Sequence, residues 1–316
     1  MNTLVSIIMS CFNETEKELS ESIDSILSQT LQDFEFIIVD DNPANDEIKK
    51  ILLSYKKDKR IKLIFNDKNL GLARSLNKAI EIATGEYIAR MDADDISLPE
   101  RIEKQICYLE THNDCSMVAT NRDDINENSE VIKEKAAIIV SDKLLPIITK
   151  YGSIITHPSV MIRTKLLKAL GGYRDFPSAQ DYDLWLRLLS SKQKIHIMPE
   201  VLLRYRIRQK GITKSNPAKQ YFCNYYAQKL FKERLKKGHD SFSLEFLLNL
   251  INSDKVTNSA LNDQYELIYS LKNKNFKSKI FIIQKIFKDC IRFPHNRLNI
   301  INLYFVKFYL LLQNPL

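Results

Sequence analysis

Short apolar runs alternate with amphipathic segments over the first 95 residues of the chain. The apolar runs have strand length and lie at residues 4–9, 34–39, 61–65 and 87–91. The segments between them repeat apolar residues at helical spacing, at residues 16–29, 46–55 and 72–83. Crossovers of this length connect parallel strands, and continuous apolar strands fit a sheet buried on both faces. The pattern predicts an α/β fold with a mostly parallel central sheet and flanking helices.

The pattern continues less regularly to about residue 215 and then changes. Ser97 to Glu100 reads as a capping box with an early proline, which predicts a helix that runs to about His112. Further strands are expected at residues 115–120, 195–198 and 202–207, a loop followed by a strand at 157–162, short helices at 165–170 and 181–190, and a loop or edge hairpin at 122–135. From Asn216 onward helical patterns dominate, so we expect one domain over residues 1–215 and a helical region over 216–316.

Polar residues follow three of the predicted strands. The first strand leads into Ser10-Cys11-Phe12-Asn13, the second ends in Asp40-Asp41-Asn42, and the fourth ends in Asp92-Ala93-Asp94-Asp95. Ligands of open α/β sheets bind beyond the carboxyl ends of strands. An isolated Asp-x-Asp is more often a solvated turn, but three polar ends at one edge of a sheet indicate a site. Two neighbouring carboxylates suit a hard divalent cation that carries phosphates.

The sequence has no glycine-rich cradle for phosphates. It holds only seven glycines, and neither Gly-x-Gly-x-x-Gly nor a P-loop occurs. A diphosphate must then be neutralised in another way, and a metal held by Asp94 would do so directly.

A second unusual segment is Gln180-Asp181-Tyr182-Asp183-Leu184-Trp185. An Asp at the start of a helix is most often a cap or a dipole partner, so this segment alone does not establish a site. His157, just before Pro158, is equally compatible with a core position and with a site.

Composition and charge narrow the class of protein. The chain has 316 residues, of which 44% are hydrophobic, and five cysteines without a Cys-x-x-Cys pair, which favours a reduced, cytosolic protein without structural zinc. We see no signal peptide, and Asn302 and Lys307 interrupt the longest apolar run before it reaches the length of a membrane span.

The net charge of +8 resides in the C-terminal third. Residues 216–316 hold 16 Lys and Arg against 7 Asp and Glu, whereas residues 1–215 hold 31 against 32. A basic region of this kind can bind nucleic acid or an anionic membrane, or serve solubility alone. Its aromatic residues lie on apolar helical faces and do not interleave with Lys and Arg, which argues against nucleic acid. The membrane interpretation and a helical region packed on the catalytic domain both remain open.

The motifs, taken in order, resemble those of family 2 glycosyltransferases. Ser6-Ile7-Ile8, Phe12-Asn13, Asp40-Asp41-Asn42, Met91 to Asp95, His157 to Val160 and Gln180 to Trp185 occur in the family's order over about residues 3–210. The resemblance is to the bacterial branch that builds capsule, exopolysaccharide or lipopolysaccharide. It implies a GT-A fold, a nucleotide-sugar donor, a divalent cation (Mn²⁺ or Mg²⁺) and inversion at the anomeric carbon.

The resemblance also implies roles for individual residues. Phe12 would lie against the nucleobase with Ser10 and Asn13 in the same loop, and Asp41 would read the base edge with Asp40 beside it. The other implied roles fall to Arg74 (base or phosphates), Asp92 (ribose or a metal-bound water), Asp94 (metal) and Asp181 (general base). His157, Gln180 and Arg208 are candidate acceptor or phosphate contacts. Gln180 stands where the family often has Glu, and Arg208 stands where it often has His, so Arg208 either removes a ligand or neutralises charge itself.

We therefore expect a cytosolic enzyme, peripheral at the inner face of the membrane. It would move one sugar per encounter, because the Gln-x-x-Arg-Trp signature of processive synthases is absent, from a UDP-sugar to a hydroxyl of a glycan or lipid-linked glycan. A degenerate transferase that acts as a binding or scaffold subunit is one alternative, and the intact Asp94 and Asp181 argue against it. A sugar nucleotidyltransferase is another alternative. Such enzymes usually carry a Gly- and Arg-rich loop after the first strand, and Ser10 to Glu14 contains neither residue.

Overall fold

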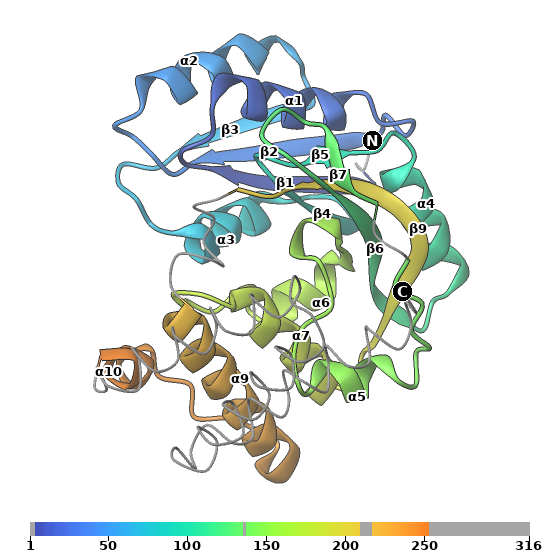
Figure 1. The fold of residues 1–316 in the computed structure, drawn as a ribbon, viewed down its shortest axis with the longest axis vertical. Helices are drawn as coiled ribbons and strands as arrows, with labels where there is room; N and C mark the ends of the chain where they lie inside the picture. Colours follow the sequence, from blue (N-terminus) through green and yellow to red (C-terminus); the bar gives the residue numbers. More distant parts are fainter. Residues whose placement is uncertain (1–3, 135–136, 209–216, 253–316) are drawn as a thin grey trace, which may run out of the picture. The chain divides into compact units, whose positions relative to one another are not determined.

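The computed structural model describes residues 4–134, 137–208 and 217–252 (Figure 1). The chain divides into two compact units. Of the described residues, 4–134, 137–147, Ser153–Asp175 and Arg187–Arg208 belong to the first unit, and Ile148–Gly152, Phe176–Leu186 and 217–252 belong to the second. The predicted division at residue 215 stays a prediction, because residues 209–216 lie outside the described part of the chain.

The first unit begins with the predicted alternation of strands and helices. Its elements are β1 (Val5–Cys11), α1 (Glu16–Leu27), β2 (Phe34–Asp40), α2 (Asp46–Ser54), η1 (Tyr55–Lys57), β3 (Ile61–Phe65), α3 (Leu72–Ile82) and β4 (Tyr87–Asp92). β1 lies between β2 and β4 and is parallel to both, and β3 extends the parallel sheet beyond β2. The α/β prediction for this region is confirmed.

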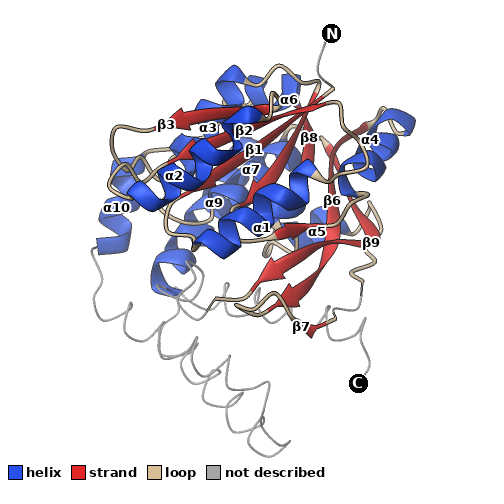
Figure 2. Ribbon diagram, turned by 90° about the horizontal axis from the view of Figure 1, so that it is seen from above, coloured by secondary structure: helices blue, strands red, loops and turns tan. Residues whose placement is uncertain are grey.

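Beyond β4 the sheet contains both antiparallel and parallel pairs. The remaining elements of this unit include β5 (Ile96–Ser97), α4 (Arg101–Thr111), β6 (Cys115–Ile125), β7 (Val131–Lys133), η2 (His157–Ser159), β8 (Met161–Arg163), α6 (Thr164–Ala169) and β9 (Lys194–Arg206), while α5 (Leu145–Thr149) crosses the division between the units. Within the described residues the sheet has nine strands in the order β3-β2-β1-β4-β8-β6-β9-β5, with β7 paired to β6 (Figure 2). Strand β8 is antiparallel to β4, and β9 is parallel to β6. The sheet is therefore mixed, and β6 with β7 forms the expected edge hairpin.

Both faces of β1, β2 and β4 are buried, as their continuous apolar character predicts, whereas the edge strand β3 is partly exposed. α1 and α2 cover one face of β1–β3, and α3 covers the other (Figures 1 and 2). Alternate β1 residues such as Ile7 and Met9 join Leu19 and Ile23 of α1 in one core cluster. Ile8 is equally buried but lies outside this cluster, on the face that α3 contacts.

Two local features of this unit differ from the predictions, although the predicted helix and strands are present. Ser97 does not cap a helix: it lies in β5, α4 begins at Arg101, and its N-cap Glu100 makes no side-chain cap bond. The two predicted strands at 195–198 and 202–207 form one strand, β9, with a register shift against β6 between Thr120 and Asn121. Pro199 has no backbone N–H, so the ladder bulges there and then continues.

A buried carboxylate ties together the amino-terminal ends of the parallel strands. Glu35 Oε1 accepts hydrogen bonds from Ser6 Oγ at 2.6 Å and from Thr84 N and Oγ1 at 2.7 Å, and Oε2 pairs with Lys62 Nζ at 2.5 Å. Burial disfavours the charged form, but the bonds from Lys62, Ser6 and Thr84 outweigh it and lower the pKa of Glu35 to about 2.

This pKa shift predicts acid sensitivity. A carboxylate whose folded pKa is depressed stabilises the fold above its unfolded pKa, near 4.5, and loses that contribution as the pH falls toward 2. We expect the difference in unfolding free energy between wild type and Glu35→Gln to shrink by about 2–3 kcal/mol between pH 5 and pH 2.5. Urea denaturation at several pH values measures it. Glu86→Gln, an exposed neighbour of the same strand region, serves as control, and a gap for Glu35→Gln that is independent of pH contradicts the prediction.

The second unit is helical over its described residues. It contains the start of α7 (Gln180–Ser190), together with α9 (Pro217–Lys237) and α10 (Leu244–Asn252). Phe176 stacks on Phe242 with ring centroids 5.2 Å apart, and Tyr226 contacts Phe246 at 5.3 Å. Gln228 Nε2 of α9 donates to Tyr182 OH at 3.1 Å, so the segment around Tyr182 packs on α9. The helical patterns predicted at residues 279–312 lie outside the described residues.

Candidate functional site

Strand register brings the predicted polar strand ends to one edge of the sheet in the first unit. In the parallel ladders Ser10 pairs with Val39 on one side and with Asp92 on the other, and Cys11 pairs with Asp40. The loops that follow β1, β2 and β4 therefore leave the sheet side by side. The prediction that these polar strand ends lie at one edge of the sheet is confirmed by the register.

The loops after β1 and β2 are joined by Asn42. Its Nδ2 donates to the carbonyl oxygen of Phe12 at 2.8 Å and to Asn13 Oδ1 at 3.0 Å. Asp40 Oδ1 accepts from the backbone N of Asn42 at 3.0 Å, and burial raises the pKa of Asp40. Phe12 remains 38% exposed, which leaves an apolar surface available to a flat ligand.

Asp41 organises the loop that precedes α3. Its buried carboxylate accepts from Asn66 Nδ2, from Leu70 N and from Gly71 N, each at 2.8 Å. Gly71 is the N-cap of α3 and has a φ of 84°, a conformation that favours glycine. One turn later Arg74 donates from Nε to Asp175 Oδ2 at 2.7 Å. Asp41 thus fixes the start of the helix that carries Arg74.

Three carboxylates gather after β4. Oxygens of Asp92, Asp94 and Asp95 all lie within 4.8 Å of one another. Asp95 is buried: its Oδ1 accepts from the backbone N of Arg206 at 2.8 Å, while its Oδ2 has no hydrogen-bond partner. Burial, followed by repulsion from Asp92, raises the pKa of Asp94 to about 7, and burial and Asp94 raise that of Asp95 well above its usual range. An unpartnered buried oxygen in a crowded carboxylate cluster fits a divalent cation.

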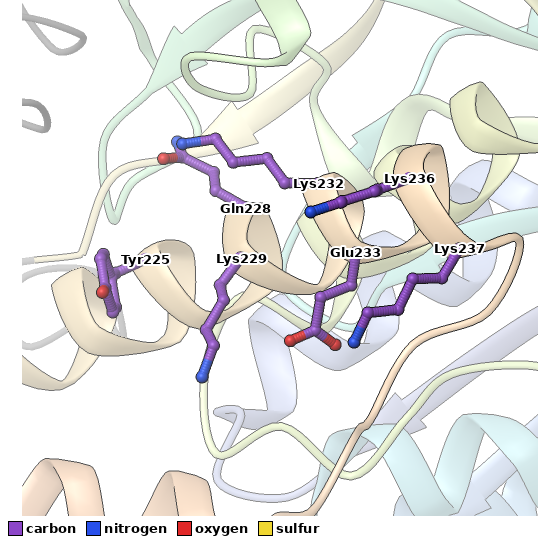
Figure 3. Close-up of a pocket in the computed structure, with 7 residues that line it drawn as sticks. All are labelled: Tyr225, Gln228, Lys229, Lys232, Glu233, Lys236 and Lys237. Carbon is purple, nitrogen blue, oxygen red and sulfur yellow. The ribbon is translucent and has the colours of Figure 1, made fainter.

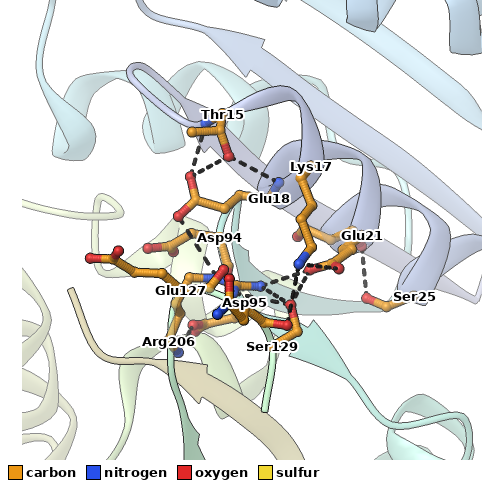
Figure 4. Close-up of polar contacts among 12 residues, drawn as sticks. Thr15, Lys17, Glu18, Glu21, Ser25, Asp94, Asp95, Glu127, Ser129 and Arg206 are labelled. Atoms are coloured by element: carbon orange, nitrogen blue, oxygen red, sulfur yellow. Dashed lines mark hydrogen bonds and ion pairs between the residues drawn. The ribbon is translucent and has the colours of Figure 1, made fainter.

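Arg206, at the end of β9, fixes the turn that carries these carboxylates (Figure 4). Its side chain is fully buried, and its Nε donates to the carbonyl oxygen of Asp94 at 2.7 Å. Nη2 pairs with Glu21 of α1 at 2.9 Å, and Nη1 donates to the carbonyl oxygen of Asn126 at 2.9 Å and to Ser129 Oγ at 3.1 Å. One guanidinium therefore joins the carboxylate turn, α1 and the hairpin between β6 and β7.

The side chain of Arg208 contacts the same turn through a carboxylate, whereas that of Arg206 contacts it through a backbone carbonyl oxygen. Its Nε forms an ion pair with Asp94 Oδ2 at 2.8 Å, and its Nη2 forms one with Glu18 Oε2 at 2.9 Å. Glu18 is itself held by the capping box of α1, where its Oε2 accepts from Thr15 N and Oγ1, both at 2.9 Å. The sequence placed Arg208 near the metal or the phosphates, and the structure places it on the predicted metal ligand.

Asp92 and His157 lie around a second buried arginine. Arg90 of β4 pairs with Asp92, and its Nε and Nη1 have no hydrogen-bond partner. Burial, followed by the charge of Arg90, lowers the pKa of His157 well below its usual range. His157 Nε2 lies 2.8 Å from Tyr173 OH, so that phenol orients the imidazole.

Asp181 and Gln180 belong to the second unit, at the start of α7. Ala179 precedes them with a φ of 61°, which turns the chain sharply into the helix. Asp181 is partly exposed, whereas Asp183 is completely buried and donates its backbone N–H to the carbonyl oxygen of Ala179 at 3.1 Å. Only the first of the two carboxylates is accessible to a substrate.

The residues that support the carboxylate turn were not predicted from the sequence. Glu18 could have been found, because Thr15-x-x-Glu18 has the spacing of a capping box. Arg206 lies in the Tyr205-Arg206-Ile207-Arg208 segment, but its main partner Glu21 is 185 positions away. No local signal distinguishes the buried Arg90 from an ordinary exposed arginine.

Comparison with known proteins gives the family. A model of the family described as "Glycosyl transferase family 2" matches residues 6–171. An uncharacterized glycosyltransferase of Methanocaldococcus jannaschii is 42% identical over 72% of this chain and 78% of its own length. The O-antigen biosynthesis glycosyltransferase WbnJ of Escherichia coli is 37% identical over 73% of this chain and 90% of its own. The amylovoran biosynthesis glycosyltransferase AmsE of Erwinia amylovora is 30% identical over 64% of this chain and 76% of its own length.

Solved structures agree on the fold. TarS of S. aureus, residues 1–349 in complex with UDP-GlcNAc, has a TM-score of 0.60 at 17% identity and covers 96% of this chain and 90% of its own. The same protein in complex with UDP has a TM-score of 0.59 at 16% identity, over 87% of this chain and 77% of its own. At this identity the likeness concerns the fold alone, which is the GT-A fold expected from the motifs. The family match and the relatives together make this chain a glycosyltransferase of family 2, of the bacterial surface-polysaccharide type.

Proposed function

We propose that the enzyme moves a single sugar from a UDP-sugar to a hydroxyl of a glycan or lipid-linked glycan, with inversion at the anomeric carbon and with a divalent cation. Two relatives are named for O-antigen and amylovoran biosynthesis, and TarS was solved with UDP and with UDP-GlcNAc. The observation that carries the proposal is the gathering of Asp92, Asp94 and Asp95 beside the ends of β1 and β2.

The carboxylates that would hold the cation are Asp94 and Asp95. Asp95 offers a buried oxygen without a partner, whereas Asp92 is already paired with Arg90 and is better suited to orient the ribose. A cation bound there would neutralise the diphosphate as it leaves. No glycine-rich loop competes for that task in this sequence.

The nucleoside would lie on the loops that Asn42 joins. The exposed ring of Phe12 offers a stacking surface, with Ser10 and Asn13 beside it. Asp41 shapes the neighbouring loop through three hydrogen bonds, so we assign it the edge of the base pocket. Arg74 is exposed, and its guanidinium pairs with Asp175. At this exposed position it is accessible to phosphates.

Asp181 would act as the general base. A sugar hydroxyl is a weak nucleophile, and a carboxylate within hydrogen-bond reach must accept its proton during attack. Asp181 is accessible at the start of α7, whereas Leu184, Trp185 and Leu188 of the same helix are buried and anchor it. We assign Gln180 and His157 to contacts with the acceptor or with phosphate oxygens, because an amide and an imidazole can both form hydrogen bonds with such groups.

Donor hydrolysis tests the proposal. The enzyme is incubated with a panel of UDP-, GDP-, CMP- and dTDP-sugars and Mn²⁺ or Mg²⁺, and release of the nucleotide and thermal stabilisation are measured. We expect one UDP-sugar to stabilise the protein and to be hydrolysed slowly without an acceptor. If no nucleotide-sugar binds or turns over, the proposed donor class is wrong.

We also propose that the basic helical region holds the enzyme at the inner face of an anionic membrane. Four lysines of α9, Lys229, Lys232, Lys236 and Lys237, line a surface pocket beside Tyr225, Gln228 and Glu233 (Figure 3). The described helices include none with the length and hydropathy of a membrane span. Each lysine near such a surface contributes about 1 kcal/mol of attraction.

Liposome flotation tests this second proposal. Replacing these four lysines by glutamate is expected to lower binding to vesicles with 30% anionic lipid by at least about 100-fold at low salt. The matched control replaces four lysines around α2 and η1, namely Lys49, Lys50, Lys56 and Lys57, and should float like wild type. If the wild-type chain does not float with anionic vesicles at low salt, the proposal of membrane association is wrong.

A further inference from the structure

The environment of Arg208 leads to an inference about how the site is loaded, and it rests on the proposed function. Arg208 contacts two carboxylates at once, Asp94 at 2.8 Å and Glu18 at 2.9 Å. Its side chain is only 26% exposed and that of Asp94 only 22% exposed, so water screens the pair weakly. The guanidinium thus occupies the carboxylate that we assign to the cation.

We propose that Arg208 is a displaceable internal counterion that makes the binding of cation and nucleoside diphosphate cooperative. A divalent cation binds carboxylate oxygens at about 2.0–2.6 Å. The Nε of Arg208 already lies 2.8 Å from Asp94 Oδ2, so a cation on this oxygen would face a second positive charge at contact distance. The cation and the guanidinium therefore compete for Asp94.

The diphosphate removes this competition. It brings negative charge to the same place, and a guanidinium is well suited to pair with phosphate oxygens. Once released from Asp94, Arg208 remains near Glu18, which the capping box of α1 holds in place. Cation alone must displace Arg208 without compensation, whereas cation with diphosphate gives the guanidinium a new anionic partner.

The surrounding charges support a role beyond simple neutralisation. The neighbouring arginines have other partners: Arg206 is buried in contacts to Glu21, Asn126 and the Asp94 backbone, and Arg90 pairs with Asp92. Among these three guanidiniums only that of Arg208 is partly exposed and bound to the Asp94 carboxylate, so it is the one that can exchange.

Linkage turns this inference into a measurable quantity. If cation and UDP each favour release of Arg208 from Asp94, each must raise the affinity of the other by the same factor. In wild type we expect Mn²⁺ alone to bind weakly and UDP to tighten it by about 10- to 100-fold. In Arg208→Gln we expect Mn²⁺ alone to bind about 5- to 10-fold more tightly than in wild type, and the coupling factor to fall by about the same 5- to 10-fold.

The experiment measures bound Mn²⁺ by electron paramagnetic resonance for the full chain, with and without UDP. Arg60→Gln is the matched control, because Arg60 is 25% exposed and ion-paired with Asp58 outside the carboxylate turn, and it should behave like wild type. Circular dichroism verifies folding, and if Arg208→Gln does not fold, Arg208→Met, which keeps the aliphatic stem, is measured in the same way.

Two results overturn the inference. One is that Mn²⁺ without UDP binds the Arg208 variant no more tightly than it binds wild type. The other is a coupling factor that the substitution leaves unchanged. The proposed function fails separately: if UDP does not bind any form, the donor assignment is wrong, while the measurements with Mn²⁺ alone still decide whether Arg208 competes for Asp94.

Discussion

Asp94→Asn is expected to abolish metal-dependent UDP binding and to lower sugar transfer below about one thousandth of the wild-type rate. The substitution removes a charged ligand from a site that prefers hard, anionic oxygens. It also removes the group that would neutralise the leaving diphosphate through a cation, a contribution of several kcal/mol. The fold should survive, because the neutral amide relieves repulsion from Asp92.

Calorimetry with UDP, in the presence and absence of Mn²⁺, measures the binding, and product formation measures the rate. Asp58→Asn is a matched control, because it also removes a carboxylate paired with an arginine but lies next to β3. It should retain both binding and turnover. Equal UDP affinity with and without Mn²⁺ in wild type, together with normal turnover of Asp94→Asn, would show that the enzyme works without a cation at this position.

Asp181→Asn is expected to lower the transfer rate by about 10²-fold or more while UDP binding stays near normal. General-base catalysis contributes this much, and the amide keeps the size and polarity of the carboxylate but cannot accept the proton. The separation of effects is diagnostic: Asp94→Asn should fail in binding, whereas Asp181→Asn should fail in transfer.

Asp183 provides the comparison within the same helix turn. It is completely buried, so Asp183→Asn should act through stability, seen as a lower melting temperature. The anomeric configuration of the wild-type product, read by NMR, tests inversion. A wild-type transfer rate for Asp181→Asn, or a product with retained configuration, contradicts the assignment of Asp181 as the base.

The helix that was predicted to begin at Ser97 shows how tertiary contacts override a local pattern. Ser97 pairs with Leu203 in the sheet, and its Oγ accepts from Gln29 Nε2 at 3.0 Å. The same distant residue also pairs with a backbone N–H at the start of α4: Gln29 Oε1 accepts from the backbone N of Ile102 at 3.1 Å. A capping partner 73 positions away leaves no trace in the local sequence.

The supports of the carboxylate turn were hidden for the same reason. A buried arginine costs free energy unless its donors are paired, so sequence alone favours an exposed position for Arg206. Its partners come from α1 and from the hairpin between β6 and β7, which the chain places far apart. The contact between Arg208 and Asp94, on which the cooperative loading depends, is equally non-local.

The sequence by itself determined the alternation of strands and helices through β4 and the polar ends of β1, β2 and β4. Period and strand-end composition are local properties, and parallel pairing then brings those ends to one edge without further information. Only the tertiary structure decided which charges meet there. Ion pairs such as Arg206 with Glu21 and Arg208 with Asp94 depend on distances between segments, and the order of residues does not encode those distances until the sheet has formed.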